Sequence, residues 1–205
     1  DVWAFYRPLI TLSFWCDQAI GGAWPPTGHL SNVFAHAVST LLIALIWRRF
    51  LPNGQAFGAA LLWAMMPGHV GSIAWVVGRV DSHTTVWCLL AVWLCLRSVE
   101  SRGRRWPTAL ATIAALMSKE LALVVPMLCT WIGWLAAEGG LLTRVRAAWR
   151  ASWPAWLVLA VYLPFRLMIL GRFGGYEAST FDPAAAAAGL GSITLDQLVP
   201  SRWIG

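Results

Sequence analysis

Charged residues are scarce in this chain. Only 12% of its 205 residues are Asp, Glu, Lys or Arg, whereas 59% are hydrophobic and the mean hydropathy is +0.63. Soluble globular domains contain about 25% charged residues, so the composition excludes an ordinary soluble domain and predicts an integral membrane protein. The net charge of +6 comes without a basic run or a base-stacking module, and a nucleic-acid partner is therefore not expected.

Cysteine pairs and metal-ligand spacings are also missing from the sequence. The four cysteines are isolated, and Cys88, Cys95 and Cys129 lie inside apolar runs, where we interpret them as small buried hydrophobic residues. His69 and His83 have no third ligand at a zinc-binding spacing, so no metal site is predicted. A need for a divalent metal is left open. Residues 1–17 lack the basic and apolar regions of a signal peptide.

Apolar runs are abundant, and six of them stand out: 30–47, 56–66, 84–96, 106–117, 121–137 and 151–170. A membrane-spanning helix needs about 20 residues to cross about 30 Å of hydrocarbon, so 56–66 and 106–117 are too short to cross alone. The sequence predicts an all-α, polytopic membrane helix bundle of about six spans, two of them short, with interfacial segments on the outer side.

Domain boundaries follow from the same pattern. Residues 1–170 are predicted to form one transmembrane domain, and 171–205 an extracytoplasmic loop. Neither end of the chain resembles the natural terminus of a membrane enzyme. The chain is therefore expected to be a fragment that lacks an N-terminal helix and the first outer loop.

Basic residues are distributed unevenly between the loops. The loops after the first, third and fifth runs hold nine of the fifteen Lys and Arg residues, whereas seven of the nine acidic residues fall on the opposite side. By the positive-inside rule, the basic loops are cytoplasmic. The polar segments then face the periplasm or an equivalent exterior, and the expected location is a bacterial inner membrane.

Two polar segments follow the two short runs on this outer side. The first, residues 66–83, contains His69, Arg79 and Asp81, and the second contains Lys119 and Glu120. Each charge at mid-membrane costs at least about 2.5 to 3.5 kcal/mol unless it is paired or hydrated. Two interpretations stay open: buried ion pairs that hold helices in register, or a cavity in which cations bind a phosphate and a carboxylate acts as a base.

Four motifs in a fixed order carry a resemblance to a known family. They are Tyr6-Arg7-Pro8-Leu9; Gly28-His29-Leu30-Ser31-Asn32 with His36; Pro67-Gly68-His69-Val70 leading to Val77-Gly78-Arg79-Val80-Asp81; and Ser118-Lys119-Glu120. The ordered set resembles the membrane half of the tetratricopeptide-repeat-associated transmembrane O-mannosyltransferases and their bacterial relatives. These enzymes lie within the GT-C glycosyltransferase superfamily.

The resemblance implies a transferase. A sugar would move from a polyprenyl-phosphate carrier to an acceptor, often a protein Ser or Thr, on the extracytoplasmic face. The lipid-linked sugar is then the donor substrate rather than a cofactor, and the partners are membrane lipid and a protein acceptor. Asp81 and Glu120 become the candidate catalytic acids. The candidate residues for binding the lipid phosphate or the substrate are Arg7, His69, Arg79 and Lys119.

Two departures from the family pattern keep other functions open. Gly71 stands where the family usually has a Glu two residues after the His, and the family's usual catalytic acid lies upstream of the Tyr-Arg-Pro-Leu motif, outside this chain. The alternatives are a transporter or flippase for an anionic lipid or solute, and a non-catalytic membrane scaffold. The sequence does not specify the sugar, the acceptor or the polyprenyl length.

Overall fold

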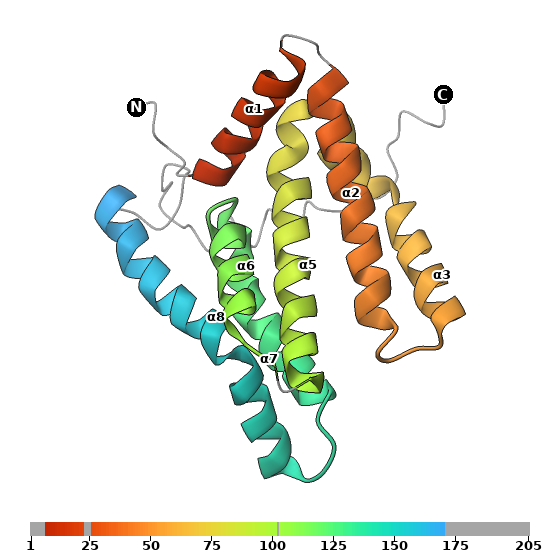
Figure 1. Cartoon of the computed structure of the whole chain (residues 1–205), viewed down its shortest axis with the longest axis vertical. Coiled ribbons are helices and arrows are strands. Elements are labelled where there is room, and N and C mark those ends of the chain that lie inside the picture. Colours follow the sequence, from red (N-terminus) through yellow and green to blue (C-terminus); the bar gives the residue numbers. More distant parts are fainter. Residues whose placement is uncertain (1–6, 23–25, 102, 171–205) are drawn as a thin grey trace, which may run out of the picture.

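A computed structural model describes residues 7–22, 26–101 and 103–170, and in these residues every regular element is a helix (Figure 1). The α-helices are α1 (Pro8–Gly21), α2 (Pro26–Trp47), α3 (Asn53–Ala64), α4 (Val70–Ala74), α5 (Arg79–Glu100), α6 (Trp106–Leu116), α7 (Val125–Leu135) and α8 (Leu141–Leu170). Three 3-10 turns join them: η1 (Pro67–His69), η2 (Val76–Gly78) and η3 (Glu120–Val124). The predicted all-α membrane bundle is confirmed.

The helices differ in whether they can cross a membrane alone. Three are long and apolar enough by themselves: Pro26–Trp47, Val76–Glu100 and Leu141–Ile169. The helix Asn53–Ala64 and the segment Pro67–Ala74 form a fourth candidate that is bent by 53° at a short break. The apolar helices Trp106–Leu116 and Glu120–Leu135 are shorter. All six apolar runs are thus helical, and the two expected to be short are short.

Two prolines lie at different places in their helices. Pro126 lies in the first turn of α7, where its missing N–H leaves no hydrogen bond unmade. The helix α8 begins at Leu141, ten residues before the last apolar run, so Pro154 lies inside the helix.

The helix α5 stands at the centre of the bundle, between α2 on one side and α6 and α7 on the other (Figure 1). The core around it is built from small residues, which include Ala91, Cys95 and Cys129. Such residues let helix backbones approach closely inside a membrane. A Cβ atom on Gly133 would lie 2.7 Å from the Cβ of Ala151, so glycine is required where α7 meets α8.

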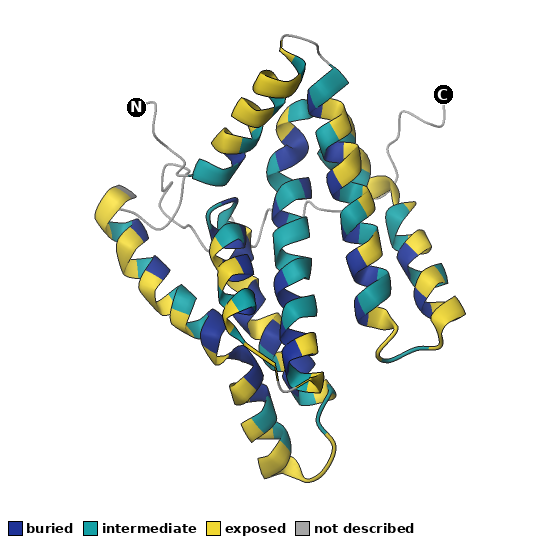
Figure 2. Ribbon diagram, viewed as in Figure 1, coloured by how far each residue is buried: buried dark blue, intermediate teal, exposed yellow. Residues whose placement is uncertain are grey.

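Many residues on the outer surface of the bundle are exposed (Figure 2), and a large share of them are apolar. Examples are Leu62, Trp131 and Met168, with exposed fractions of 72%, 63% and 85%. Exposed apolar surface on this scale is expected where lipid is the solvent. Cys95 and Cys129 are fully buried, as predicted, whereas Cys88 is half-buried and Cys16 is exposed.

Candidate functional site

One end of the bundle gathers ionisable side chains from four separate elements. The starts of α1, η3 and α5 and the end of α8 meet at this end, in the upper part of Figure 1. We call it the polar end. Five of the six site residues predicted from the sequence lie here in three groups of contacts, and the sixth, His69, lines a cavity beside Asp81.

The first group is centred on Glu120. Arg7 donates to its Oε2 at 3.0 Å, and Arg166 donates to its Oε1 at 2.6 Å. Arg166 also donates to the hydroxyl of Tyr162 at 2.7 Å, and that hydroxyl donates to the Leu116 carbonyl at 3.1 Å. The side chain of Arg166 is only 3% exposed. A chain of charged hydrogen bonds therefore ties the chain before α1 and the start of η3 to α8 and the end of α6.

The second group encloses Arg79. Its side chain has no exposed surface, and it forms an ion pair with Asp17 on α1. Its Nη1 donates to Ser13 Oγ at 3.3 Å, its Nη2 approaches the Gly28 carbonyl at 3.5 Å, and its guanidinium lies 3.9 Å from the centre of the Phe14 ring. The guanidinium thus anchors α1 to the start of α5. Direct phosphate contact by Arg79 stays a prediction.

The third group is the ion pair between Lys119 and Asp81, which joins the two polar segments singled out in the sequence. The Lys119 side chain is 28% exposed and that of Asp81 is 46% exposed. Among the predicted site residues, these two therefore belong to the most accessible ion pair. A ligand can therefore reach this cation and this carboxylate, because both side chains are already partly exposed.

A small polar cavity of about 60 Å³ lies beside Asp81 and is also lined by His36, Ser39 and His69. Ser39 Oγ and His69 Nε2 are buried and have no hydrogen-bond partner among the residues that the structure describes. The His69 ring packs 4.4 Å from Trp63, between centroids. A cavity of this size has room for about two water molecules, which buried polar atoms of this kind usually bind. His69 and Asp81 are thereby brought to one cavity.

An apolar pocket of about 360 Å³ lies between α6 and α8 and approaches the first group of contacts. Its walls include Leu116, Met117, Val161, Tyr162 and Phe165. Tyr162 also carries the hydroxyl that Arg166 contacts, so a pocket fit for a hydrocarbon chain adjoins a cluster fit for an anion.

Polar residues on α2 serve helix packing. Asn32 and His36 are four residues apart and share one face of α2. Asn32 Nδ2 donates to the Trp75 carbonyl at 3.0 Å, and His36 Nε2 lies 3.1 Å from the Ala64 carbonyl. Both side chains thus hold α2 against the interrupted segment between α3 and α5.

Two residues of the polar end, Asp17 and Arg166, were not predicted from the sequence. Each is the only charged residue in an apolar stretch, 8–22 for Asp17 and 151–170 for Arg166. Ionisable residues in such stretches normally face protein and find a partner, and that signal could have identified both.

The fold and the arrangement of charges define an integral membrane protein, an all-α helix bundle with a polar end. Its sequence is similar to protein O-mannosyl-transferases. It is 37% identical to Tmtc1 of Drosophila melanogaster over 129 residues, which cover 60% of this chain and 15% of the relative. It is 38% identical to TMTC2 of Mus musculus over 111 residues, or 52% of this chain and 13% of the relative.

A protein O-mannosyl-transferase of Caenorhabditis elegans is 26% identical over 180 residues, which cover 86% of this chain and 24% of the relative. The resemblance stated from the four motifs is confirmed. The chain spans less than a quarter of the length of these relatives, between 13% and 24%. No protein-family model and no solved structure matches the chain.

Proposed function

We propose that this chain is part of the membrane domain of a glycosyltransferase. The enzyme moves a sugar from a polyprenyl-phosphate carrier to a Ser or Thr hydroxyl of a protein, on the extracytoplasmic face of the membrane. The relatives are named protein O-mannosyl-transferases, which supports mannose as the sugar and protein as the acceptor. The lipid-linked donor and the side of the membrane are inferred from the chemistry of the polar end and from the distribution of basic residues.

The observation that carries the proposal is the junction between the apolar pocket and the Glu120 group. A polyprenyl phosphate has a branched hydrocarbon tail and an anionic head, so its site needs an apolar groove that ends at cations. The pocket between α6 and α8 supplies the groove, and Arg166 contacts a residue of its wall, Tyr162. Guanidinium and ammonium groups are the usual protein donors to phosphate.

The accessibility of the side chains supports the following roles. Lys119 and Arg7, with side chains 28% and 20% exposed, contact the phosphate directly. Arg166 lies deeper and holds Glu120 and Tyr162 in place. Both carboxylate oxygens of Glu120 are bound by guanidiniums, whereas Asp81 has one partner and is more exposed. Asp81 is therefore the better proton acceptor of the two acids that this chain offers.

The reaction exchanges one bond for another at the anomeric carbon. The acceptor oxygen forms a bond to that carbon as the bond to the phosphate oxygen breaks, and the hydroxyl proton passes to a carboxylate. The phosphate leaves with an added negative charge, which Lys119 and Arg7 stabilise. An acidic residue outside this chain can share the base role with Asp81, and either carboxylate can accept the proton of the hydroxyl.

The test measures sugar transfer and donor binding in the intact protein, reconstituted with polyprenyl-phosphate mannose and a Ser/Thr peptide. Lys119→Ala and Arg7→Ala should each weaken donor binding about tenfold or more, because each removes a charged hydrogen bond worth about 1.5 to 3 kcal/mol. Asp81→Asn should slow transfer while leaving donor binding nearly unchanged. Arg144→Ala removes a partly exposed cation from the start of α8, far along that helix from Arg166, and is the matched control.

Two results would overturn the proposal. One is donor binding by the Lys119 and Arg7 variants that equals binding by the Arg144 control. The other is movement of the labelled lipid between leaflets with no sugar transferred, which would assign the protein to the transporters.

The side of the membrane is tested separately by labelling single cysteines in a cysteine-free background. A cysteine at Gly68, next to the polar cavity, should react only with reagents added from outside. A cysteine at Val145 should react only from the cytoplasm. Reversed labelling would place the polar end in the cytoplasm and contradict the extracytoplasmic reaction.

A further inference from the structure

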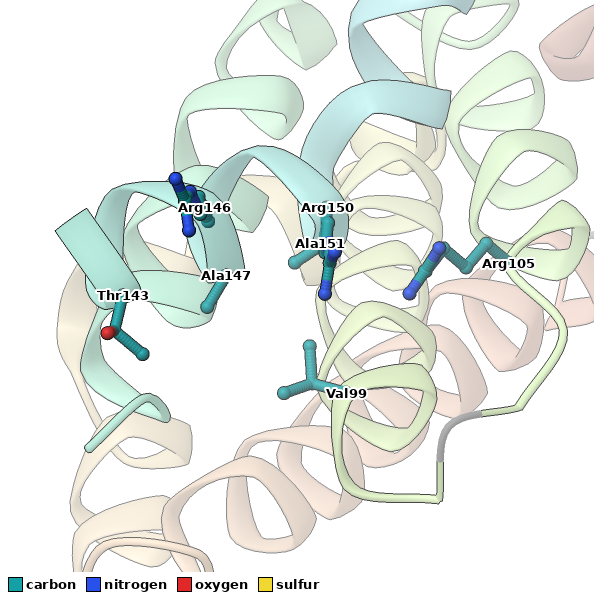
Figure 3. Close-up of a pocket in the computed structure, with 7 residues that line it drawn as sticks. All are labelled: Val99, Arg105, Thr143, Arg146, Ala147, Arg150 and Ala151. Atoms are coloured by element: carbon teal, nitrogen blue, oxygen red, sulfur yellow. The ribbon is translucent and has the colours of Figure 1, made fainter. Parts of the chain in front are cut away.

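A second polar feature lies at the end of the bundle opposite to the polar end. A cavity of about 570 Å³ opens between the end of α5, the loop before α6 and the start of α8. Arg105, Arg146 and Arg150 line it, together with Thr143, Val99 and two alanines (Figure 3). We call it the arginine cavity. In Figure 3, Arg105 and Arg150 point toward each other across the opening.

No acidic side chain lines the arginine cavity among the described residues. Glu100 follows Val99 in the sequence, but its carboxylate is bound by Arg49 at 2.8 Å. None of the three arginines of the cavity takes part in an ion pair within the described part of the chain, and the Nε of Arg105 is buried without a hydrogen-bond partner. Three guanidiniums that share one cavity repel one another, so the arrangement costs free energy until an anion enters.

Membrane topology alone does not explain this convergence. The positive-inside rule requires basic residues near the ends of the spans, but it does not require their side chains to face one cavity. Arg104 and Arg144 meet the rule equally well, and neither lines the cavity. Arg144 instead donates to the carbonyl of Gly139 at 3.2 Å.

The position of the cavity relates it to the membrane surface. Arg146 and Arg166 are 20 residues apart on α8, which corresponds to about 30 Å of helix, the thickness of the hydrocarbon layer. With Arg166 at one boundary of the hydrocarbon, Arg146 and Arg150 lie near the other. This is the depth at which the phosphates of one leaflet lie, and basic pockets between helices at that depth suit anionic headgroups.

We propose that the arginine cavity binds a phosphate group and is a second anion site, independent of the proposed donor site at the polar end. Arg105 and Arg150 bind the phosphate from opposite walls of the cavity, and Thr143 and Arg146 form part of the remaining wall. Guanidinium groups bind phosphate with paired hydrogen bonds, and the cavity volume leaves room for the glycerol part of a headgroup. The phosphate belongs either to an anionic phospholipid or to a small soluble anion, since both offer the same chemistry.

The experiment compares two double variants of the intact protein, Arg105→Gln with Arg150→Gln and Arg104→Gln with Arg144→Gln. Both remove two positive charges from the same loop and the same helix, but only the first pair lines the cavity. Binding is measured in nanodiscs of phosphatidylcholine that contain spin-labelled phosphatidylglycerol, and separately in detergent with inorganic phosphate. Circular dichroism and gel filtration establish that both variants are folded.

The first pair should lose about tenfold or more in affinity for one of the two probes, whereas the second pair should bind as the unchanged protein does. A loss of affinity for phosphatidylglycerol identifies a lipid site, and a loss of affinity for inorganic phosphate identifies a site for a soluble ligand. Lys119→Ala should leave this binding unchanged, which separates it from the donor site. Equal binding by the two double variants, or no saturable binding of either probe, would overturn the proposal.

Discussion

The two ends of the bundle differ in whether their cations are paired with carboxylates. At the polar end, three carboxylates, those of Asp17, Asp81 and Glu120, face four cations, and all seven take part in ion pairs. At the arginine cavity, three guanidiniums share one space, and no carboxylate lines it among the described residues. The partners at the polar end come from elements far apart in the sequence, so pairing there also fixes how the helices pack.

The difference separates two uses of a charge in a membrane protein. A charge that is buried with its partner stabilises one arrangement of helices, and removing either partner leaves an unpaired buried charge. A cation left without a partner near the surface contributes little to folding and remains available to a ligand. The contrast therefore predicts effects on stability that decrease from the polar end to the arginine cavity, and four variants test this order.

The largest effect is expected for Glu120→Gln. The change leaves Arg7 and Arg166 without their shared carboxylate, and Arg166 is almost fully buried. The free energy of unfolding should fall by about 3 to 5 kcal/mol, as measured by denaturant unfolding in detergent micelles. Glu138→Gln is the control, because Glu138 forms no ion pair within the described residues. A loss no larger than that of the control would show that the Glu120 group does not hold the helices together.

A smaller loss is expected for Asp17→Asn. Arg79 keeps its contacts with Ser13 and the Phe14 ring, and the amide oxygen of the new Asn can still accept one hydrogen bond. The free energy of unfolding should fall by about 1 to 3 kcal/mol, and limited proteolysis should cut α1 more readily. Gln18→Asn, on the exposed face of the same helix, should change neither. A protected α1 in the Asp17 variant would contradict the anchoring role of Arg79.

A third substitution, Asp81→Asn, separates stability from function within the polar end. In its ion pair with Lys119, the Asp81 side chain is 46% exposed and that of Lys119 is 28% exposed, so solvent screens much of the attraction. The free energy of unfolding should change by less than about 1 kcal/mol, while sugar transfer by the intact protein falls. The two measurements are made on the same preparation, with Lys119→Met for comparison. A loss of stability as large as that of Glu120→Gln would assign Asp81 a structural role.

The smallest effect, and one of opposite sign, is expected at the arginine cavity. In detergent without phospholipid or phosphate, Arg105→Gln with Arg150→Gln removes mutual repulsion. The free energy of unfolding should rise by about 0.5 kcal/mol at low salt. The gain should vanish in about 1 M NaCl, where the Debye length is about 3 Å. A clear loss of stability at low salt would show that these arginines have partners that hold the fold.

Hydrophobicity and charge in the sequence were enough to predict the helices and the meeting of the two polar segments. The short runs 56–66 and 106–117 predicted that the polar segments after them would lie at one end, and Asp81 and Lys119 do meet there. The partners of Arg79 and Glu120 were not predictable in the same way. Asp17 and Arg166 reach them only because α1 and α8 fold toward the polar end, and such packing has no periodic signature in the sequence.

Helix boundaries show a second limit of the sequence. The last run was predicted to begin at residue 151 because the charged segment before it, 141–150, is not apolar. That segment is rich in Leu, Ala and Arg, which are strong helix formers, so α8 continues through it. Hydropathy marks where a helix enters the hydrocarbon, whereas intrinsic propensity decides where the helix begins. Part of the wall of the arginine cavity comes from this segment, 141–150, which hydropathy alone leaves out of the last helix.

The shortness of α3 has a consequence for the lipid around the protein. Its 12 residues span only about 18 Å, well below the hydrocarbon thickness of about 30 Å, and Phe57, Leu61 and Leu62 are exposed along it. The helix α3 is long enough to be a candidate span only together with Pro67–Ala74, which is bent from it by 53°. Where lipid meets α3 alone, each ångström of mismatch costs a fraction of a kcal/mol, and a locally thinner bilayer lowers that cost. We therefore expect the bilayer to be thinner beside α3 than beside the long helices of the bundle.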